Sequence, residues 1–416
     1  MDSAGPVSSA LPAGASRKPR IILGVAGGIA AYKACELLRL LTESGHDVRV
    51  VPTASALKFV GAPTWAALSG HPVHDEVWSD VHEVPHVSLG RSADLVIVAP
   101  ATADMLAKAA HGLADDLLTN TLLTAVCPVV FAPAMHTEMW QNAATVANVA
   151  TLRSRGAIVI EPAVGRLTGA DTGKGRLPEP AEILEIVRRL LSRGPVAADL
   201  AGRHVVVTAG GTREPLDPVR YLGNRSSGKQ GYAFARAAVA RGARVTLIAA
   251  NVLLVDPAGA GIVRVGTTEE LRKATLEAAA DADVVVMAAA PADFRPTVYE
   301  TLKIKKRPDG SAPTIELTTN PDIAAEVGAR KRDGQLLVAF AAETNDAIAN
   351  GHGKLVRKRA DLIVVNEVGA DKAFGLNTNA ATVIAADGTS TVLPEQSKED
   401  LADAVLDLVV PRLQPG

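Results

Sequence analysis

Short apolar runs alternate with amphipathic stretches along most of the chain, which is the pattern of βαβ units. In the first half, the apolar runs predict strands at residues 20–25, 47–51, 94–99, 127–132 and 157–160. The stretches between them predict helices at residues 29–44, 103–110, 115–125 and 181–191. Strands separated by helices pair in parallel, with helices covering both faces of the sheet.

A second series of the same kind follows. It predicts strands at residues 204–208, 244–249, 284–288, 336–340 and 362–365, and helices at residues 228–241, 269–280, 347–359 and 398–410. The residues between the two series are small and include Pro and Gly, as in a linker. The predicted organisation is a disordered tail at 1–19, one domain at 20–191, a linker at 192–202 and a second domain at 203–416.

The expected fold is α/β, with two doubly wound, mostly parallel Rossmann-like sheets in tandem. The halves resemble each other weakly, because residues 93–101 (ADLVIVAPA) and 282–290 (ADVVVMAAA) are both strands followed by a loop of small residues. Open α/β sheets bind ligands in such loops. Two similar sheets in tandem and an internal duplication both explain the similarity.

Composition narrows the class of protein. The 416 residues are 48% hydrophobic but only 3% aromatic, and 43 Lys+Arg against 45 Asp+Glu give a net charge of −2. A nucleic-acid-binding protein would usually carry a basic excess. The stretch 117–137 has no charged residue, but Asn120, Pro128 and Pro133 interrupt it, so we expect no membrane partner.

Residues 1–19 have no apolar core of the kind that marks a signal peptide. Cys35 and Cys127 are not part of a CxxC pattern, so they offer no zinc site and fit a reducing cytoplasm. We therefore expect a cytoplasmic protein that binds no nucleic acid.

The turn after the first strand contains Gly27 and Gly28, with Ile29 and Ala30 at the start of the next helix. Backbone amides at a helix N-terminus attract phosphate. The G-x-G-x-x-G spacing of dinucleotide sites is absent, so a mononucleotide such as FMN suits the turn better. A Gly-Gly pair that merely closes the junction is the structural alternative.

Three further segments carry a specific resemblance. They are His86, the string APATAD at 99–104 and the string P-x-M-x-x-x-M-W at 133–140. Together they resemble the flavin-dependent cysteine decarboxylases of coenzyme A biosynthesis. The resemblance implies a flavodoxin-like flavoprotein domain in which His86 is the base that acts on the substrate thiol. Without the resemblance, His86 would more often be interpreted as a structural histidine.

In this family the P-x-M segment positions the substrate carboxylate, and here it carries His136 where the family has Asn. The resemblance also implies a set of flavin contacts. They are Gly27, Gly28, Ile29, Ala30, Thr53, Ser55, Pro100, Ala101, Thr102, Asp104 and Met135.

Flavin chemistry explains the decarboxylation, because hydride transfer from the substrate to FMN creates the electron sink through which CO₂ leaves. Family members usually carry a flap cysteine that donates the final proton. The corresponding segment here, 165–178, has no cysteine. Thr168, Asp171 or water are the candidate donors, or the reaction stops at the enethiol.

In the second half, residues 223–230 read G-x-x-x-x-G-K-Q, which differs from a P-loop by its missing Ser/Thr. A long loop also separates these glycines from the preceding strand, so this is not a P-loop NTPase. A phosphate-binding helix start remains a good interpretation. If residues 303–306 form a strand, Lys303 and Lys305 point to one face, toward a triphosphate or simply toward solvent.

A second resemblance rests on five segments: 210–229 (GGTREPLDPVRYLGNRSSGK), 292–296 (ADFRP), 303–306 (KIKK), 319–323 (TNPDI) and 340–344 (FAAET). They look like the bacterial, CTP-using phosphopantothenate–cysteine ligases. The resemblance implies that Arg220 and Asn224 hold the acyl-cytidylate and phosphopantothenate. With His86, His136 and Lys303 they form the expected catalytic set.

The implied contacts to substrate and CTP extend over most of the second half. They are Ser226, Ser227, Gly228, Lys229, Met287, Ala288, Ala289, Asp293, Lys303, Lys305, Lys306, Pro321, Asp322, Ile323, Ala324, Phe340, Lys354 and Lys358.

The expected function is therefore bifunctional, with FMN and Mg²⁺ as cofactors and with unassigned Mg²⁺ ligands. The second domain would join 4′-phosphopantothenate to L-cysteine through an acyl-CMP, and the first would decarboxylate the product to 4′-phosphopantetheine. The family resemblance further implies a homo-oligomer, commonly a dodecamer. Two alternatives stay open: a first domain that is only oxidative or regulatory, and an NAD-dependent or nucleotide-sugar oxidoreductase, which the missing G-x-G-x-x-G disfavours.

Overall fold

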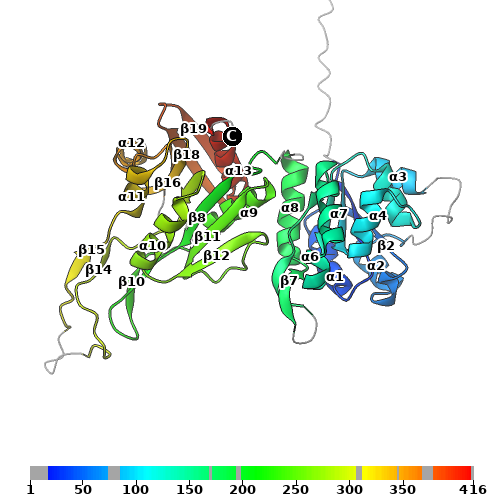
Figure 1. Ribbon diagram of the computed structural model, residues 1–416, viewed down its shortest axis with the longest axis horizontal. Helices are drawn as coiled ribbons and strands as arrows, with labels where there is room; N and C mark the ends of the chain where they lie inside the picture. Colours follow the sequence, from blue (N-terminus) through cyan, green and yellow to red (C-terminus); the bar gives the residue numbers. More distant parts are fainter. Residues whose placement is uncertain are drawn as a thin grey trace, which may run out of the picture. The chain divides into compact units, whose positions relative to one another are not determined.

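The computed structural model describes residues 17–73, 85–167, 171–193, 198–305, 312–343, 346–367 and 378–413. The chain divides into two compact units (Figure 1). The first unit comprises residues up to Val159 and Glu179–Leu184, and the second comprises Ile160–Pro178 and the chain from Glu185 onward. Because these units exchange short segments, the border predicted at 192–202 stays a prediction.

A five-stranded parallel sheet forms the centre of the first unit, in the order β2-β1-β3-β4-β5. Its strands are β1 (Arg20–Val25), β2 (Asp47–Pro52), β3 (Leu95–Ala101), β4 (Val129–Pro133) and β5 (Ile158–Val159). Every residue of β3 is buried, as expected of a central strand with helices on both faces. This order is flavodoxin-like, and its ligand edge lies where β1 and β3 are neighbours.

The predicted helices of the first unit are present at nearly the predicted positions, and the unit also contains helices that the sequence did not predict. They are α1 (Ala31–Glu43), η1 (Ala56–Lys58), α2 (Ala62–Ser69), α3 (Pro85–Ser92), α4 (Ala103–His111), α5 (Leu117–Thr124), α6 (Thr137–Gln141) and α7 (Ala143–Ser154). The helix α8 (Pro180–Arg193) follows later in the chain. Side-chain caps fix three helix starts, because Thr102 accepts from the Met105 amide, Asp116 from the Thr119 amide and Asn142 from the Ala144 amide.

The second unit contains an eight-stranded sheet in the order β12-β11-β8-β13-β16-β17-β18-β19. Its strands are β8 (His204–Gly210), β11 (Arg244–Ala250), β12 (Ala260–Val265), β13 (Val284–Met287), β16 (Leu336–Glu343), β17 (Leu362–Glu367), β18 (Thr378–Ala385) and β19 (Ser390–Ser397). The first six pair in parallel, whereas β18 and β19 are antiparallel. The parallel part has the Rossmann order, whose switch point lies between β8 and β13.

Helices cover both faces of this sheet (Figure 1). One face packs against α9 (Lys229–Ala240) and α13 (Lys398–Val409). The other face packs against α10 (Thr268–Ala279), α11 (Ile323–Arg330) and α12 (Ala347–Lys358). Three small antiparallel pairs complete the unit: β6 (Ala163–Arg166) with β7 (Thr172–Arg176), β9 (Arg213–Pro215) with β10 (Tyr221–Gly223), and β14 (Phe294–Pro296) with β15 (Leu317–Thr319). The short helix η2 (Val410–Arg412) follows α13.

The predicted fold class is confirmed, and the structure differs from the expected tail at its last three residues. Residues 17–19 were assigned to a disordered tail, but Arg17 pairs with Asp94 and the Pro19 carbonyl accepts from the Asp47 amide. Residues 1–16 lie outside the described part of the chain. Residues 303–305 are not a strand, because the backbone of Ile304 bonds to side chains instead of to a neighbouring strand.

In the described part of the chain, none of the helices has both the length and the hydropathy that a membrane span requires.

A buried charged cluster joins α9 to α13. Arg241 directly follows α9, is only 2% exposed as a side chain, and donates to Asp199 and Asp407. Asp403, which is 1% exposed, lies 3.8 Å from the same guanidinium and also pairs with Arg189 of α8. Burying one charge without its partner costs several kcal/mol, so this cluster stabilises the unit only while it is complete.

We therefore expect Arg241→Met to lower the free energy of unfolding by about 3–5 kcal/mol, because it leaves Asp403 and Asp199 without their shared cation. Urea denaturation of the full chain measures this loss. The matched control is Arg244→Met, which removes an exposed ion pair with Asp281 and should cost less than about 1 kcal/mol. Equal losses in the two variants would contradict this account of the cluster.

Candidate active sites

A cavity of about 470 Å³ lies at the carboxyl edge of the eight-stranded sheet. Its lining residues belong to β13 and the loop after it, to β16 and β17, to the starts of α9 and α11 with the residues before them, to α12, and to the first residues of β18 and α13. Many of the residues assigned from the ligase resemblance line it together. They are Asn224, Ser226, Ser227, Gly228, Lys229, Met287, Ala288, Ala289, Asp293, Pro321, Asp322, Ile323, Ala324, Phe340, Lys354 and Lys358.

Two buried hydroxyls position the loop that follows β13. Thr208, near the end of β8, accepts from the Ala289 amide at 3.1 Å, and Thr212 accepts from the Ala292 amide at 2.8 Å. Both threonines are fully buried. Asn224 also donates its side-chain amide to the Pro291 carbonyl at 2.9 Å. The loop 288–293 and the segment around Asn224 are thereby held side by side in the cavity wall.

The start of α9 forms another wall. Gly228 is its N-cap at φ +79°, and a Cβ added there would lie 2.6 Å from Val252 Cγ2, so only glycine fits. Lys229 follows directly, and the amino end of the helix dipole adds partial positive charge at this position. Phe340 of β16 packs edge-on against Phe234 of α9, with ring centroids 5.7 Å apart. This wall is suited to a phosphorylated ligand.

Cations from α12 stand near the N-terminus of α11. Asp322 caps α11 by accepting from the Ala325 amide, and it also accepts from Lys358 Nζ at 2.6 and 2.7 Å. Burial opposes ionisation of this carboxyl, but the Lys358 ammonium and the Ala325 amide hold the pKa of Asp322 below its ordinary value. Lys358 is therefore a paired cation in this structure.

Three assigned residues in the described part of the chain do not line the cavity. Arg220 lies beside the loop that contains Lys303 and Lys305, where it donates to the Ile304 carbonyl at 2.5 Å. Lys303 and Lys305 are exposed. Lys306 lies outside the described residues.

Several cavity residues were not predicted. Asn366 could have been found, because it follows the apolar part of β17 at the same sheet edge. Asn379 and Lys398 had no local signal, since the antiparallel strands that bring them there were not predicted. The other unpredicted lining residues are Gln230, Gly231, Ala290, Pro291, Ala292, Asn320, Ala339, Ala342 and Arg357.

In the first unit, the residues assigned to the flavin share one edge of the sheet. The Thr53 amide donates to the Val25 carbonyl and the Ala26 amide to the Pro100 carbonyl, which joins the loops after β2, β1 and β3. The Ala134 amide donates to the Ala101 carbonyl, so Met135 after β4 comes to the same edge.

The close packing of these loops fits a mononucleotide at this edge. A Cβ added to Gly27 would lie 2.3 Å from the Ser55 Cβ, whereas one added to Gly28 would meet Thr102 Cγ2 at 3.7 Å. Gly27 thus permits contact between the loops after β1 and β2. Beside it, Ile29 is 63% exposed, so the start of α1 has a side chain free to contact a ligand.

His86 lies on α3, and its backbone carbonyl accepts from the Thr124 hydroxyl of α5 at 2.7 Å. Its ring atom Nδ1 is buried and has no hydrogen-bond partner. Buried polar atoms are nearly always paired, so an unpaired ring nitrogen indicates a group that awaits a ligand.

The segment that carries Met135 and His136 begins a short helix. His136 is the N-cap of α6, without a side-chain bond to the helix. The next residue, Thr137, has a buried hydroxyl with no hydrogen-bond partner. The start of α6 therefore offers a polar group for a ligand, which agrees with the expected carboxylate contact.

The expected flap forms an antiparallel hairpin of β6 and β7, described here as part of the second unit. Thr168 lies outside the described residues, and Asp171 is exposed. Burial raises the pKa of both the Cys35 and the Cys127 thiol. Neither cysteine is therefore poised as a thiolate.

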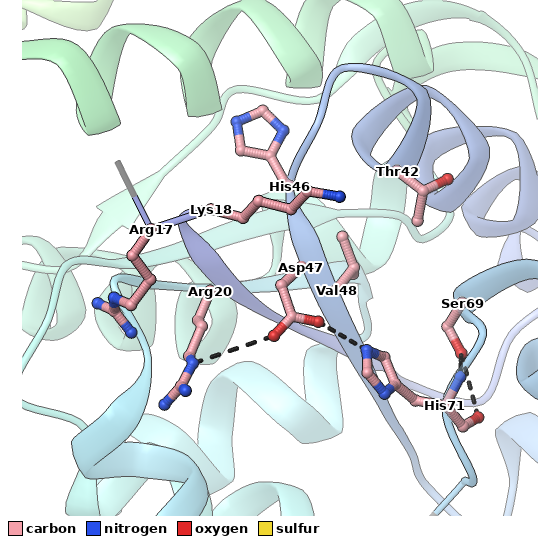
Figure 2. Close-up of a pocket in the computed structure, with 9 residues that line it drawn as sticks. All are labelled: Arg17, Lys18, Arg20, Thr42, His46, Asp47, Val48, Ser69 and His71. Carbon is pink, nitrogen blue, oxygen red and sulfur yellow. Dashed lines mark hydrogen bonds and ion pairs between the residues drawn. The ribbon is translucent and has the colours of Figure 1, made fainter. Parts of the chain in front are cut away.

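A second cavity, of about 370 Å³, lies at the opposite, amino edge of the first unit's sheet (Figure 2). Figure 2 shows Asp47 at its centre, accepting from His71 Nε2 at 2.6 Å, with Arg20 Nε 4.0 Å away. None of the assigned site residues lines it.

Comparisons with known proteins agree with this arrangement. A Flavoprotein family model matches residues 10–192, and the model for the DNA/pantothenate metabolism flavoprotein C-terminal domain matches residues 200–412. The Coenzyme A biosynthesis bifunctional protein CoaBC of Mycobacterium tuberculosis is 58% identical over 402 residues, covering 94% of this chain and 96% of the relative. The Bacillus subtilis protein of the same name is 43% identical, covering 93% and 95%.

Among solved structures, the C-terminal domain of a CoaBC protein matches with 33% identity and a TM-score of 0.45, covering 52% of this chain and 97% of that one. The matches to the two family models and to the bifunctional relatives span both units. The chain therefore belongs to the CoaBC family of bifunctional coenzyme A biosynthesis proteins, with the activities of a phosphopantothenoylcysteine decarboxylase and a phosphopantothenate–cysteine ligase.

Proposed function

We propose that this chain uses CTP to join 4′-phosphopantothenate to L-cysteine in the second unit, and FMN to decarboxylate the product in the first. The observation that carries the proposal is the cavity in the second unit, where residues from four separate sequence motifs meet. Its size, its cations and its helix N-termini suit a nucleotide together with a second phosphorylated substrate.

The ligase must first activate a carboxylate, which is a poor electrophile. The carboxylate of phosphopantothenate attacks the α-phosphorus of CTP, which forms an acyl-CMP and releases pyrophosphate. The cysteine amine then attacks the acyl carbon, and CMP leaves with the electron pair of the broken bond. Lys354, Lys358 and Lys229 offset the charge that develops on the phosphates, the kind of interaction that usually contributes most to such a reaction.

Asn224 is our proposed positioning residue for the acyl intermediate. Its bond to Pro291 fixes the side chain against the loop 288–293, which supplies backbone groups to the same cavity. Arg220 and Lys303 belong to the proposed site on the family resemblance alone.

Magnesium remains an expectation for the ligase. In the described part of the chain, no group of three or more His, Cys, Asp or Glu side chains is placed to hold a metal ion. We therefore assign no step to protein-bound Mg²⁺.

In the first unit, we propose that the loops after β1, β2 and β3 hold FMN, with Met135 at the same edge. FMN held there would supply a reversible hydride acceptor, so that the net decarboxylation would be redox-neutral. His86 takes the thiol proton of the substrate, and its buried Nδ1, which has no hydrogen-bond partner, supports this role. His136 and the start of α6 bind the substrate carboxylate.

A second candidate is a first unit that only oxidises its substrate or regulates the ligase. The observation that favours it is the hairpin of β6 and β7, which has no cysteine to donate the final proton. We also expect a homo-oligomer, commonly a dodecamer in this family, in a cytoplasmic setting with no nucleic-acid or membrane partner.

Asn224→Asp should lower the rate of pyrophosphate release about 100-fold or more, because it removes the donor to Pro291 and adds negative charge beside the phosphates. A coupled pyrophosphate assay measures this. Decarboxylation of supplied phosphopantothenoylcysteine serves as the internal control and should be unchanged. A ligase rate within a factor of two of the unsubstituted protein would refute the proposed role.

His86→Asn should lower CO₂ release from supplied phosphopantothenoylcysteine by about 10²–10⁴-fold, because the base for the thiol is lost. The ligase rate should stay unchanged. The matched variant is His111→Asn, an exposed histidine on α4, which should leave both rates unchanged. Undiminished CO₂ release by His86→Asn would remove the histidine from the mechanism.

A further inference from the structure

The tip of the hairpin that joins β9 to β10 is built around one buried carboxylate. Asp217 Oδ1 accepts from the amides of Val219 and Arg220, each at 2.8 Å, which is the pattern of an Asx turn. The Arg220 carbonyl accepts from the Leu216 amide at 2.8 Å and closes the loop. The backbone that leads to Arg220 is therefore fixed from within the hairpin.

The second oxygen of the same carboxylate holds a segment that lies 87 positions further along the chain. Asp217 Oδ2 accepts from the Ile304 amide at 3.1 Å and lies 3.3 Å from Arg220 Nε. In turn, Arg220 Nη2 donates to the Ile304 carbonyl at 2.5 Å. A further bond, from the Glu300 amide to the Leu216 carbonyl at 3.0 Å, joins the same two segments. Both backbone groups of Ile304 are thus bonded to one Asp–Arg ion pair.

Burial and charge make this carboxylate a fixed anchor. The Asp217 side chain is 0% exposed, whereas the Arg220 side chain is 46% exposed. Burial opposes ionisation of the carboxyl, but the amides of Val219, Ile304 and Arg220 hold the pKa of Asp217 below its ordinary value. Asp217 is therefore an anion at neutral pH, and without it three backbone amides would lose their acceptor.

The segment held by this anchor carries exposed basic side chains. Lys303 and Lys305 flank Ile304, and both are exposed. A long flexible side chain samples many rotamers, so the place where its ammonium group can act depends on the backbone from which it extends. Arg220 is held by the same carboxylate from the other side. The anchor therefore brings together basic residues from two separate motifs of the ligase resemblance.

We propose that Asp217 is a positioning residue of the ligase, which holds Arg220 and the segment of Lys303 in the arrangement that receives the phosphorylated acid substrate. The inference rests on the proposed ligase function and adds to it a residue without an assigned role. Asp217 acts through its neighbours and not by contact with substrate, because no part of its side chain is exposed. Its contribution is to fix the two segments relative to each other before substrate binds.

The test is Asp217→Asn in the full chain. Asparagine keeps one oxygen for the amides of Val219 and Arg220, but its Nδ2 takes the place of Oδ2 and cannot accept from the Ile304 amide. The kcat/KM for phosphopantothenate, measured by pyrophosphate release, should fall about ten- to a hundredfold. The KM for cysteine and the CO₂ release from supplied phosphopantothenoylcysteine should not change. An unchanged kcat/KM for phosphopantothenate would overturn the proposal.

A second carboxylate separates positioning from stability. Asp283 accepts from the His204 amide at 2.7 Å and from Arg203 Nη1 at 3.1 Å, but it lies directly before β13, at the sheet edge opposite the cavity. Asp283→Asn therefore removes a comparable set of bonds. Thermal unfolding should show a lower midpoint for both variants, whereas only Asp217→Asn should lose ligase rate. Similar losses of ligase rate in both variants would reduce Asp217 to a structural residue and overturn the proposal.

A double-mutant cycle tests whether Asp217 acts through Arg220. If it does, Asp217→Asn and Arg220→Ala together should lower kcat/KM by less than the product of their separate effects. A combined effect equal to that product would mean that the two residues act independently, which contradicts the inference.

Hydrogen exchange tests the anchor without catalysis. In the absence of substrates, Asp217→Asn should speed exchange of the Ile304 amide about tenfold or more and leave that of the His204 amide unchanged. Unchanged exchange at Ile304 would overturn the proposal. Failure of the proposed function gives a different result, because the unsubstituted chain would then release no pyrophosphate from the three substrates, and the positioning role would fall with the ligase.

Discussion

The arrangement of the ligase site depends on the parallel pairing of β8 with β13 and on two buried threonine hydroxyls at its end. Parallel strands end at one edge, so every loop that follows them is available to a common ligand. Thr208 and Thr212 then bond the amides of Ala289 and Ala292 and fix the loop after β13. Without these bonds, the amides would be buried and unpaired, at a cost of about 1–3 kcal/mol each.

The same constraint explains why one edge collects the proposed phosphate-binding groups from distant parts of the chain. The helices α9 and α11 both begin at this edge, so the positive ends of their dipoles lie there. The helix α13 begins there for a different reason, because the antiparallel hairpin of β18 and β19 returns the chain to the edge. The first unit repeats the principle with the loops after β1, β2, β3 and β4.

Much of the fold could be predicted from the sequence. The apolar periodicity predicts the parallel strands, and strands that alternate with helices can be connected in only a few ways. The positions of Gly228 and Asp322 at helix starts also follow from local chemistry. Other features depend on contacts between distant segments. The irregular backbone at Lys303 and Lys305 is one of them, because Ile304 is bonded to the side chains of Arg220 and Asp217 and not to a neighbouring strand. Lys398 reaches the cavity only through a hairpin whose two strands carried no recognised signal.

The central claim is that both units act in sequence on one substrate. The most direct measurement is mass spectrometry of a single reaction that contains the purified chain, 4′-phosphopantothenate, L-cysteine, CTP and Mg²⁺. The account predicts 4′-phosphopantetheine as the product, in equal amount to the CMP released. Accumulation of phosphopantothenoylcysteine or of its decarboxylated enethiol would contradict it, because the first unit would then fail to complete its reaction.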